Sequence, residues 1–205
     1  MNVRFGLILM EFQSLRDYVA LLERNLPGVI ERESAIKAGL ADLGVDELAT
    51  YDLAELQSGV TTRLIGGSAI TALWAAYESA VLYCATYLQQ RREVRLSLQD
   101  LRGSFLERAR QYFDDVLKFD LHPPETTDWD RLRLLAELRN SFAHDNGVYP
   151  GSRARRAKRL REWVAATPGL SIADGYVVPQ IAFVREATAH VAAVVGELIN
   201  RTRDS

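Results

Sequence analysis

The sequence has little cysteine and little histidine, the residue types that most often signal disulfides, zinc sites and metal catalysis. It contains one cysteine, Cys84, and three histidines among 205 residues. A lone cysteine excludes an intramolecular disulfide and suits a reducing compartment, and we expect Cys84 to be a small core residue. The histidines are far apart and no HExxH or CxxC spacing occurs, so we predict no metal site. Because a Walker loop, a GxSxG elbow and a glycine-rich dinucleotide turn are missing too, we predict no cofactor.

Long hydrophobic runs are missing as well. The apolar run at residues 5–10 is too short for a signal-peptide core, Glu11 follows it directly, and no stretch approaches the length of a membrane span. Hydrophobic residues make up 48% and charged residues 25%, values typical of a globular protein. A net charge of −2 argues against a protein that coats nucleic acid, although local basic patches can bind it. We therefore expect a cytoplasmic protein without membrane contact, folded as a single domain over residues 1–205.

Apolar residues recur at helical spacing along most of the chain, which predicts helices. Over roughly the first forty residues the pattern indicates one kinked helix or two stacked helices, because Pro27-Gly28 interrupts it. A short helix is expected at residues 46–56. Gly66-Gly67-Ser68 is interpreted as a break, with Ser68 as the cap of the next helix, whose apolar stripe covers residues 70–88.

The second half of the chain continues this pattern with one exception. Ser97 and Asp100 form a capping-box pattern, which predicts the start of a further long helix reaching residue 116. Residues 170–172 and 176–178, joined through Asp174-Gly175, are typical of a small β-hairpin. A last helix is expected at residues 180–201. The predicted fold is therefore an all-α helical bundle with a small β-hairpin before the last helix.

The most informative stretch is the helix predicted at residues 128–147. Thr127 or Asp128 can cap its start, and Asp145-Asn146-Gly147, with Pro150 just beyond, is typical of its end. Its expected buried stripe consists of Leu132, Leu135, Leu138 and Phe142. Its other face aligns four polar residues, which are Arg133, Glu137, Asn140 and His144.

Arg139 lies about 140° from His144 around this helix, at the border of the apolar side. A guanidinium in this position requires a carboxylate or a partner across an interface. Glu78, on the flank of the apolar stripe at residues 70–88, is the candidate carboxylate. Two interpretations of Glu78 remain open: a carboxylate at the core boundary, or a supporting residue that orients Arg139 from the neighbouring helix.

The residues Arg139-Asn140-Ser141-Phe142-Ala143-His144 resemble the R-N-x-x-x-H signature of the HEPN superfamily. Its members are compact helical domains, and many of them are metal-independent ribonucleases that act as toxins or antiviral effectors. The resemblance implies that Arg139, Asn140 and His144 are catalytic. His144 would act as base or acid, Arg139 would hold the phosphate, and Asn140 would orient the imidazole or the phosphate. The expected products are a 2′,3′-cyclic phosphate and a 5′-hydroxyl.

The resemblance also implies partners. One histidine supplies half of an acid/base pair, and HEPN ribonucleases complete it by forming a homodimer in which two motifs share a cleft. Toxins of this type are often controlled by an antitoxin or another regulatory protein. Members paired with a nucleotidyltransferase antitoxin often carry tyrosine two places after the motif histidine. Because Asn146 stands there and the nearest tyrosine is Tyr149, the resemblance does not imply a tyrosine-modifying antitoxin.

A basic segment follows the motif helix, and it has two interpretations. Six of the nine residues at positions 153–161 are basic. They form either the solvated face of a short helix, with Leu160 and Trp163 turned inward, or a ridge that binds RNA phosphates. The candidate RNA-binding residues are Arg153, Arg155, Arg156, Lys158 and Arg159.

Alternatives from other functional classes remain open. The chain can be a non-catalytic HEPN module that binds RNA or nucleotide or serves in assembly. It can also be a helical scaffold in which the motif is a helix end, with His144 near the C-terminal dipole and Arg139 paired with an acid. A second Arg-x4-His pair, Arg185 and His190, is interpreted as structural because it lies among small apolar residues of the last helix.

Overall fold

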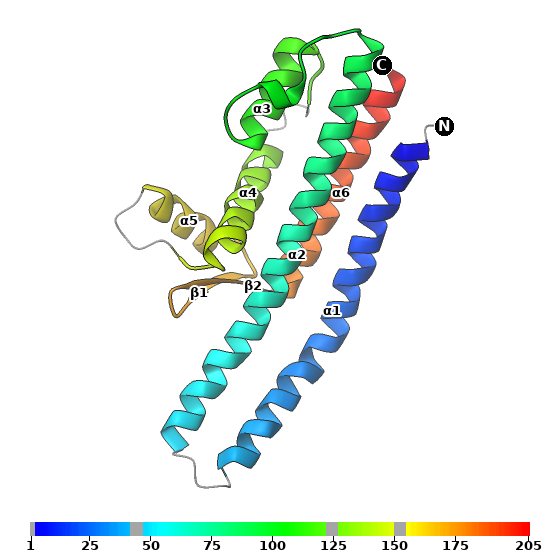
Figure 1. The fold of residues 1–205 in the computed structure, drawn as a ribbon. Coiled ribbons are helices and arrows are strands. Elements are labelled where there is room, and N and C mark those ends of the chain that lie inside the picture. The colour runs from blue at the N-terminus through cyan, green and yellow to red at the C-terminus, as the bar shows by residue number, and fades with distance from the viewer. Residues whose placement is uncertain (1–2, 42–46, 122–126, 150–154) are drawn as a thin grey trace.

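The computed structural model describes residues 3–41, 47–121, 127–149 and 155–205. Three long helices form the body of the molecule (Figure 1). They are α1 (Val3–Ala41), α2 (Glu47–Arg91) and α6 (Ile181–Asp204). Each of the three packs against the other two, and their apolar residues supply most of the buried core. Within the described residues, none of the helices combines the length and the apolar character needed to cross a membrane.

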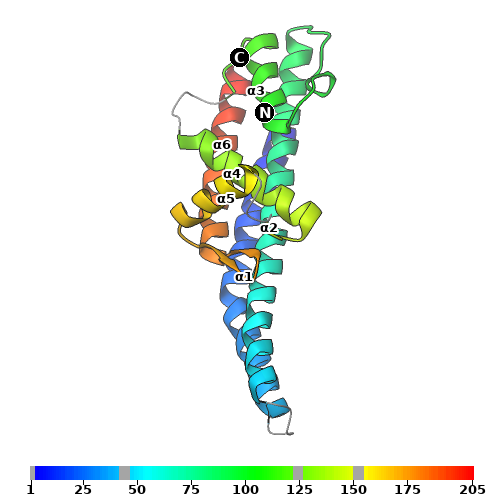
Figure 2. The same ribbon diagram turned by 90° about the vertical axis from the view of Figure 1, so that its left-hand side faces the viewer.

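The shorter elements cover the side of α2 that lies away from α1 (Figures 1 and 2). α4 packs against α2, α5 packs against α4 and β1, and β2 packs against α2. These elements are the turns η1 (Leu98–Asp100) and η2 (Tyr112–Val116), the helices α3 (Phe105–Gln111), α4 (Thr127–Asp145) and α5 (Arg155–Ala166), and the strands β1 (Leu170–Ala173) and β2 (Tyr176–Pro179). The expected fold class, all-α with a small hairpin before the last helix, is confirmed.

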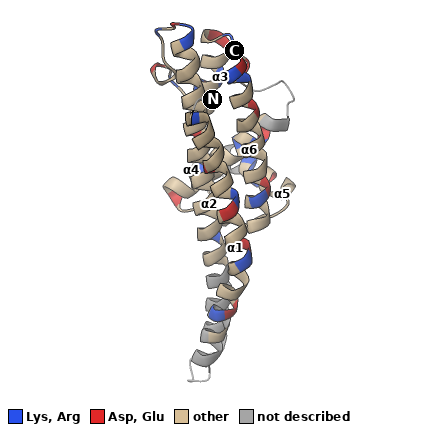
Figure 3. Cartoon of the chain, turned by 90° about the vertical axis from the view of Figure 1, so that its right-hand side faces the viewer, with Lys and Arg blue, Asp and Glu red and all other residues tan. Residues whose placement is uncertain are grey.

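The outward face of α1 carries few charges near its N-terminus. Seen from that side, the first turns of the helix are mostly uncharged (Figure 3). Val3, Leu7 and Met10 are each more than half exposed there. These apolar residues of α1 lie on the opposite side of α2 from α4 (Figure 1).

The hairpin forms where the sequence predicts it. β1 and β2 are antiparallel, with Ala173 paired with Tyr176 across a two-residue turn. Asp174 and Gly175 have φ values of 49° and 78°, which Asp and Gly tolerate better than most residues. Gln180 then occupies the N-cap position of α6, where its side chain makes no capping hydrogen bond.

The predicted break at Gly66-Gly67-Ser68 is wrong. α2 is one continuous helix, the segment expected as a separate helix at residues 46–56 belongs to it from Glu47 on, and Ser68 Oγ donates to the Leu64 carbonyl inside it. The glycines serve close packing instead. A Cβ on Gly66 would lie 2.4 Å from the Pro179 carbonyl oxygen, and one on Gly67 would lie 2.3 Å from a ring carbon of Phe142. Likewise α1 passes through Pro27 as one helix, the first of the two alternatives for that region.

The long helix predicted after Ser97 ends at residue 116 as expected, but its predicted start is wrong, because the helical stretch of α3 and η2 begins only at Phe105. The box of Ser97 and Asp100 exists, with the Ser97 amide 2.8 Å from the carboxylate, but it caps only the short turn η1. Gly103, at φ 117°, redirects the chain, and a second box of Ser104 and Glu107 starts α3. Burial of Cys84, a core residue as expected, raises the pKa of its thiol to about 12.

The glycine packing predicts opposite effects for one substitution at two places in α2. Gly66→Ala is expected to destabilise the protein by about 1–3 kcal/mol, because the new methyl group meets a backbone carbonyl that cannot move cheaply. Gly59→Ala, with nothing within 4 Å of the added Cβ, is expected to stabilise it by about 0.5–1 kcal/mol. Urea unfolding of the three proteins measures both effects. If Gly66→Ala left the stability unchanged or raised it, Gly66 would not be a packing requirement.

Candidate functional site

The motif helix α4 has the buried face that the sequence predicts. Leu132, Leu135 and Leu138 are buried, and Phe142 is half-buried with its ring beside Gly67. The helix ends at Asp145, followed by Asn146 and Gly147 with φ values of 52° and 78°. The Gly147 amide donates to the Ser141 carbonyl at 3.0 Å, which closes the last turn.

A buried arginine of α2 holds this helix end in place. Arg63 is only 7% exposed, and its Nη1 donates to the Asn146 carbonyl at 2.7 Å. Its guanidinium carbon also lies 4.0 Å from the centre of the Tyr176 ring, a cation–π distance. A cation at the carboxyl end of a helix interacts favourably with the helix dipole. Arg63 therefore joins α2, the end of α4 and the hairpin.

The chain after α4 is fixed by backbone hydrogen bonds to the same hairpin. The Val177 amide donates to the Gly147 carbonyl at 2.9 Å, and the Tyr149 amide donates to the Gly175 carbonyl at 2.7 Å. These bonds act together with the Arg63 contact. The last turn of α4, which carries His144, is thus anchored on its carboxyl side.

The other face of α4 borders a cleft of about 640 Å³ between α2, α3, α4 and α5. Arg139 and Asn140 of the motif line it, as does Glu78 from α2. The complete lining consists of Trp74, Glu78, Ser104, Phe105, Leu106, Glu107, Arg108, Arg133, Ala136, Glu137, Arg139, Asn140 and Arg159. The cleft is of the size that small-molecule sites usually have.

Glu78 meets Arg139, the contact that one of the two sequence interpretations predicts. Arg139 Nη2 lies 3.9 Å from Glu78 Oε2, and Arg139 Nη1 donates to Asn140 Oδ1 at 3.0 Å. Glu78 Oε1 also accepts the indole N–H of the buried Trp74 at 2.7 Å. Since the short contact of the carboxylate goes to the indole, Glu78 fits the boundary interpretation as well. The guanidinium of Arg139 is oriented by Asn140 and held loosely by Glu78.

Two further arginines at the cleft have acidic partners. Arg159 Nη2 lies 3.3 Å from Glu137 Oε1, and its guanidinium carbon lies 5.0 Å from the Trp163 ring centre. Arg133 pairs at 3.1 Å with Asp130, at a position where both side chains are exposed. Exposed pairs of this kind contribute little and exchange partners readily.

His144 does not line the cleft. It is exposed on the last turn of α4, about 6 Å along the helix axis beyond Asn140. The structure therefore brings Arg139, Asn140 and Glu78 together and leaves the imidazole outside, one turn away. The helix-end interpretation of His144, with the histidine close to the C-terminal dipole, fits this position too.

The basic segment is only partly described. Arg153 lies outside the described residues, and Arg155 and Arg156 belong to α5 without described side chains. Lys158 is exposed and lies 3.9 Å from Glu162. Arg159 alone among the predicted RNA-binding residues lines the cleft in the described part of the chain. Leu160 is buried and Trp163 is half-buried, which agrees with the solvated-face interpretation.

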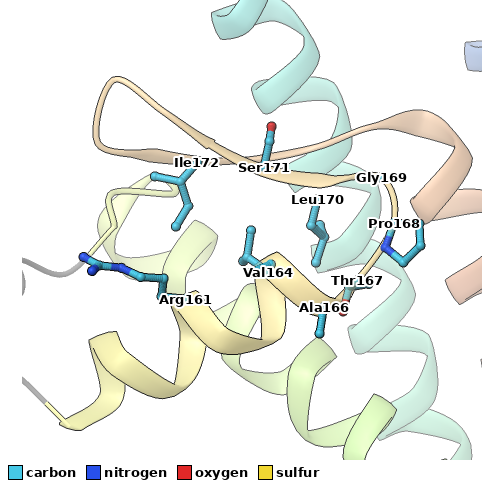
Figure 4. Close-up of a pocket in the computed structure, with 10 residues that line it drawn as sticks. Arg161, Val164, Ala166, Thr167, Pro168, Gly169, Leu170, Ser171 and Ile172 are labelled. Atoms are coloured by element: carbon cyan, nitrogen blue, oxygen red, sulfur yellow. The ribbon is translucent and has the colours of Figure 1, made fainter.

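Two other hollows lack the motif residues. One lies under the hairpin, where Val164 of α5 and Leu170 of β1 face one another while Ser171 points away (Figure 4). The other, of about 230 Å³, lies between α4 and α6 and is lined by His190. Arg185 turns instead toward Glu23 of α1. The second Arg-x4-His pair thus forms no common site.

Comparison of the chain with protein-family models, with curated proteins and with solved structures gives no match. The resemblance at residues 139–144 therefore stands on those residues and their geometry. Among the described residues, no three His, Cys, Asp or Glu side chains are grouped so that they could hold a metal ion.

Sequence reasoning missed three residues near the motif: Arg63, Phe105 and Arg108. Phe105 and Arg108 fall within the long helix predicted after Ser97, where Arg108 is one of several charged residues. Arg63, in contrast, is the only charged residue between Glu55 and Glu78. The isolated charge of Arg63 is a local signal that could have found it. The positions of Phe105 and Arg108 depend on how α2, α3 and α4 pack, so no local pattern could have singled those two out.

Two substitutions separate the roles of Glu78. Glu78→Gln keeps an acceptor for the Trp74 indole and removes the charge near Arg139, so we expect a loss of at most about 1 kcal/mol in unfolding free energy. Glu78→Leu leaves the buried indole N–H unpaired and is expected to cost about 1–3 kcal/mol. Chemical unfolding followed by tryptophan fluorescence measures both. If Gln costs as much as Leu, the charge pairing with Arg139 is the main role of Glu78.

Proposed function

We propose that this protein is a metal-independent endoribonuclease of HEPN type, with a toxin or phage-defence role, whose site is shared by two copies of the chain. One observation carries the proposal. The Arg139 guanidinium is oriented at an open cleft by Asn140 and is only loosely paired with Glu78, while an exposed His144 follows one turn later on the same helix. This arrangement offers a phosphate ligand and an imidazole that can act as base or acid.

The chemistry needs a base, an acid and a cation. An imidazole takes the proton of the ribose 2′-hydroxyl, and the 2′-oxygen attacks the phosphorus. The bond from phosphorus to the 5′-oxygen breaks, and that oxygen takes a proton from an imidazolium. Arg139 stabilises the added negative charge on the phosphorane by paired hydrogen bonds. The products are a 2′,3′-cyclic phosphate and a 5′-hydroxyl.

A second copy supplies the missing half of the acid/base pair. In the described part of one chain the two histidines are His144 and His190, and His190 lines a different hollow. Two copies that meet through the exposed ends of α4 bring two His144 side chains to one phosphate. A dimer formed through the apolar face of α1 would keep them apart.

The alternative is a non-catalytic module that binds RNA or nucleotide or serves in assembly. The position of His144 outside the cleft favours it. A cleft lined by Arg139, Arg133 and Arg159 can hold a phosphate whether or not an imidazole is in reach.

Cleavage of labelled RNA in the presence of EDTA tests the proposed metal-independent ribonuclease activity. Wild type is expected to cut and leave cyclic-phosphate ends, and His144→Ala is expected to lose roughly 10²–10⁴-fold in rate because the acid/base group is gone. Arg139→Ala is expected to lose activity as well. His122→Ala and Arg185→Ala, which remove the same residue types outside the motif, are the matched controls and should cut like wild type. If wild type cuts none of several RNAs, or if His144→Ala cuts equally well, the proposal is wrong.

A crosslinking experiment tests the shared site separately. Because the native Cys84 is buried, a cysteine introduced at the exposed Asp145 reports on that position alone. Asp145→Cys is expected to form a disulfide-linked dimer under mild oxidation, since two α4 ends that share a cleft bring the residues close. Leu7→Cys, on the exposed face of α1, is the comparison. Efficient dimer formation through position 7 but not position 145 would contradict the shared site.

A further inference from the structure

The inner end of the cleft holds an arginine that has no role in the motif. Arg108 of α3 lines the cleft, and its Nε is buried and has no hydrogen-bond partner among the described residues. Arg108 as a whole is half-buried, but a buried N–H without an acceptor is costly. An anionic ligand in the cleft would supply the missing charge.

The charges of the cleft also favour an anion at this end. Of its acidic residues, Glu78 faces Arg139, and Glu137 pairs with Arg159. Glu107 is engaged by the Ser104 hydroxyl and amide at 2.8 and 3.0 Å, and these hydrogen bonds lower the pKa of its carboxyl group. Glu107 stays negatively charged, but the lining carries four arginines against three glutamates, and Arg108 forms no ion pair within the described residues. The exposed Arg133, whose acidic partner Asp130 lies outside the cleft lining, can join Arg108.

An aromatic surface lies beside these cations. Phe105 is half-buried and lines the cleft. Its ring meets those of Trp74 and Tyr77 edge to face, with centroids 6.3 and 6.2 Å apart, and this packing fixes its orientation. A ring fixed in this way next to arginines is the combination on which unpaired bases of single-stranded nucleic acids stack.

We propose that this cleft binds one unpaired nucleotide of a single-stranded RNA, with its phosphate on Arg108 and Arg133 and its base against Phe105. The volume of about 640 Å³ accommodates a single nucleotide but no duplex. Bases in an A-form helix are stacked inside and cannot reach such a cleft, whereas bases in loops can. The lining runs along α4 from Arg133 to Asn140, so the strand leaves the cleft toward His144. That the ligand is RNA rests on the proposed function, whereas nucleotide binding itself does not.

The test measures binding without cleavage. The full chain is titrated with adenosine 5′-monophosphate, adenosine and inorganic phosphate by calorimetry. The monophosphate is expected to bind more tightly than either of its parts. Equal affinity for the monophosphate and for inorganic phosphate would overturn the proposal, because the cleft would then recognise only an anion. No binding of the monophosphate would overturn it too.

Four variants locate the site. Arg108→Gln, Arg133→Gln and Phe105→Leu are each expected to weaken monophosphate binding roughly 5- to 100-fold, the range for loss of a stacking or phosphate contact. Arg110→Gln, on the same short helix but outside the cleft lining and paired with Asp114, is the matched control and should bind like wild type. Arg133 is exposed, so its variant tests the site even if the Phe105 variant fails to fold. Equal losses at Arg110 and at Arg133 would overturn the assignment.

A second experiment distinguishes a failure of this inference from a failure of the proposed ribonuclease activity. The His144→Ala protein is expected to bind single-stranded RNA at least tenfold more tightly than a duplex of the same sequence, and equal binding would contradict the unpaired-nucleotide site. If wild type cleaves RNA but the monophosphate does not bind, this inference fails and the ribonuclease stands. If the monophosphate binds at Arg108 but no RNA is cut, the ribonuclease fails and the nucleotide site stands.

Discussion

The close approach of α2 to the end of α4 and to the hairpin is the constraint on which the rest of the structure depends. Gly66 and Gly67 remove the side chains that would keep these elements apart, and Arg63 fills the contact with a cation that satisfies the Asn146 carbonyl. With α2 and α4 at this separation, Glu78 reaches Arg139 and the cleft opens on their common flank. A wider spacing would leave the guanidinium of Arg139 without a carboxylate and the Asn146 carbonyl without its arginine donor.

The elements that follow from the sequence are those defined by local chemistry. The stripe of Leu132, Leu135 and Leu138 fixes the buried face of α4, and Asp174-Gly175 fixes the hairpin turn, because both depend on neighbours within one or two turns of chain. The incorrect predictions concern positions where contacts between residues far apart in the sequence decide the structure. Gly66-Gly67 resembles a break because glycine has low helix propensity, yet tertiary packing against Pro179 and Phe142 outweighs that cost of about 1 kcal/mol per residue.

The candidate site likewise contains residues that the sequence pattern predicts and residues whose positions depend on tertiary packing. The pairing of Glu78 with Arg139 could be anticipated because each residue stands on the flank of a strong amphipathic stripe, and such flanks meet when two helices pack. Arg108 could not, since the sequence places it on a long helix that the structure replaces with two capped segments. Where Gly103 redirects the chain, it turns Phe105 and Arg108 toward α4. Because the sequence predicts the helix start at Ser97 and not at Ser104, it does not indicate that Phe105 and Arg108 line the cleft.

For the proposed ribonuclease, the separation of His144 from the cleft decides how RNA could be cleaved. One chain presents its phosphate ligands on one side of α4 and its imidazole on the next turn, at a helix end that Arg63 and the hairpin hold rigid. Because that end is anchored, rotation of the last turn does not bring the imidazole inward without breaking several hydrogen bonds. The remaining route is intermolecular. The proposed catalysis would then depend on a second copy approaching the exposed end of α4, whereas the proposed nucleotide binding in the cleft would require only one chain.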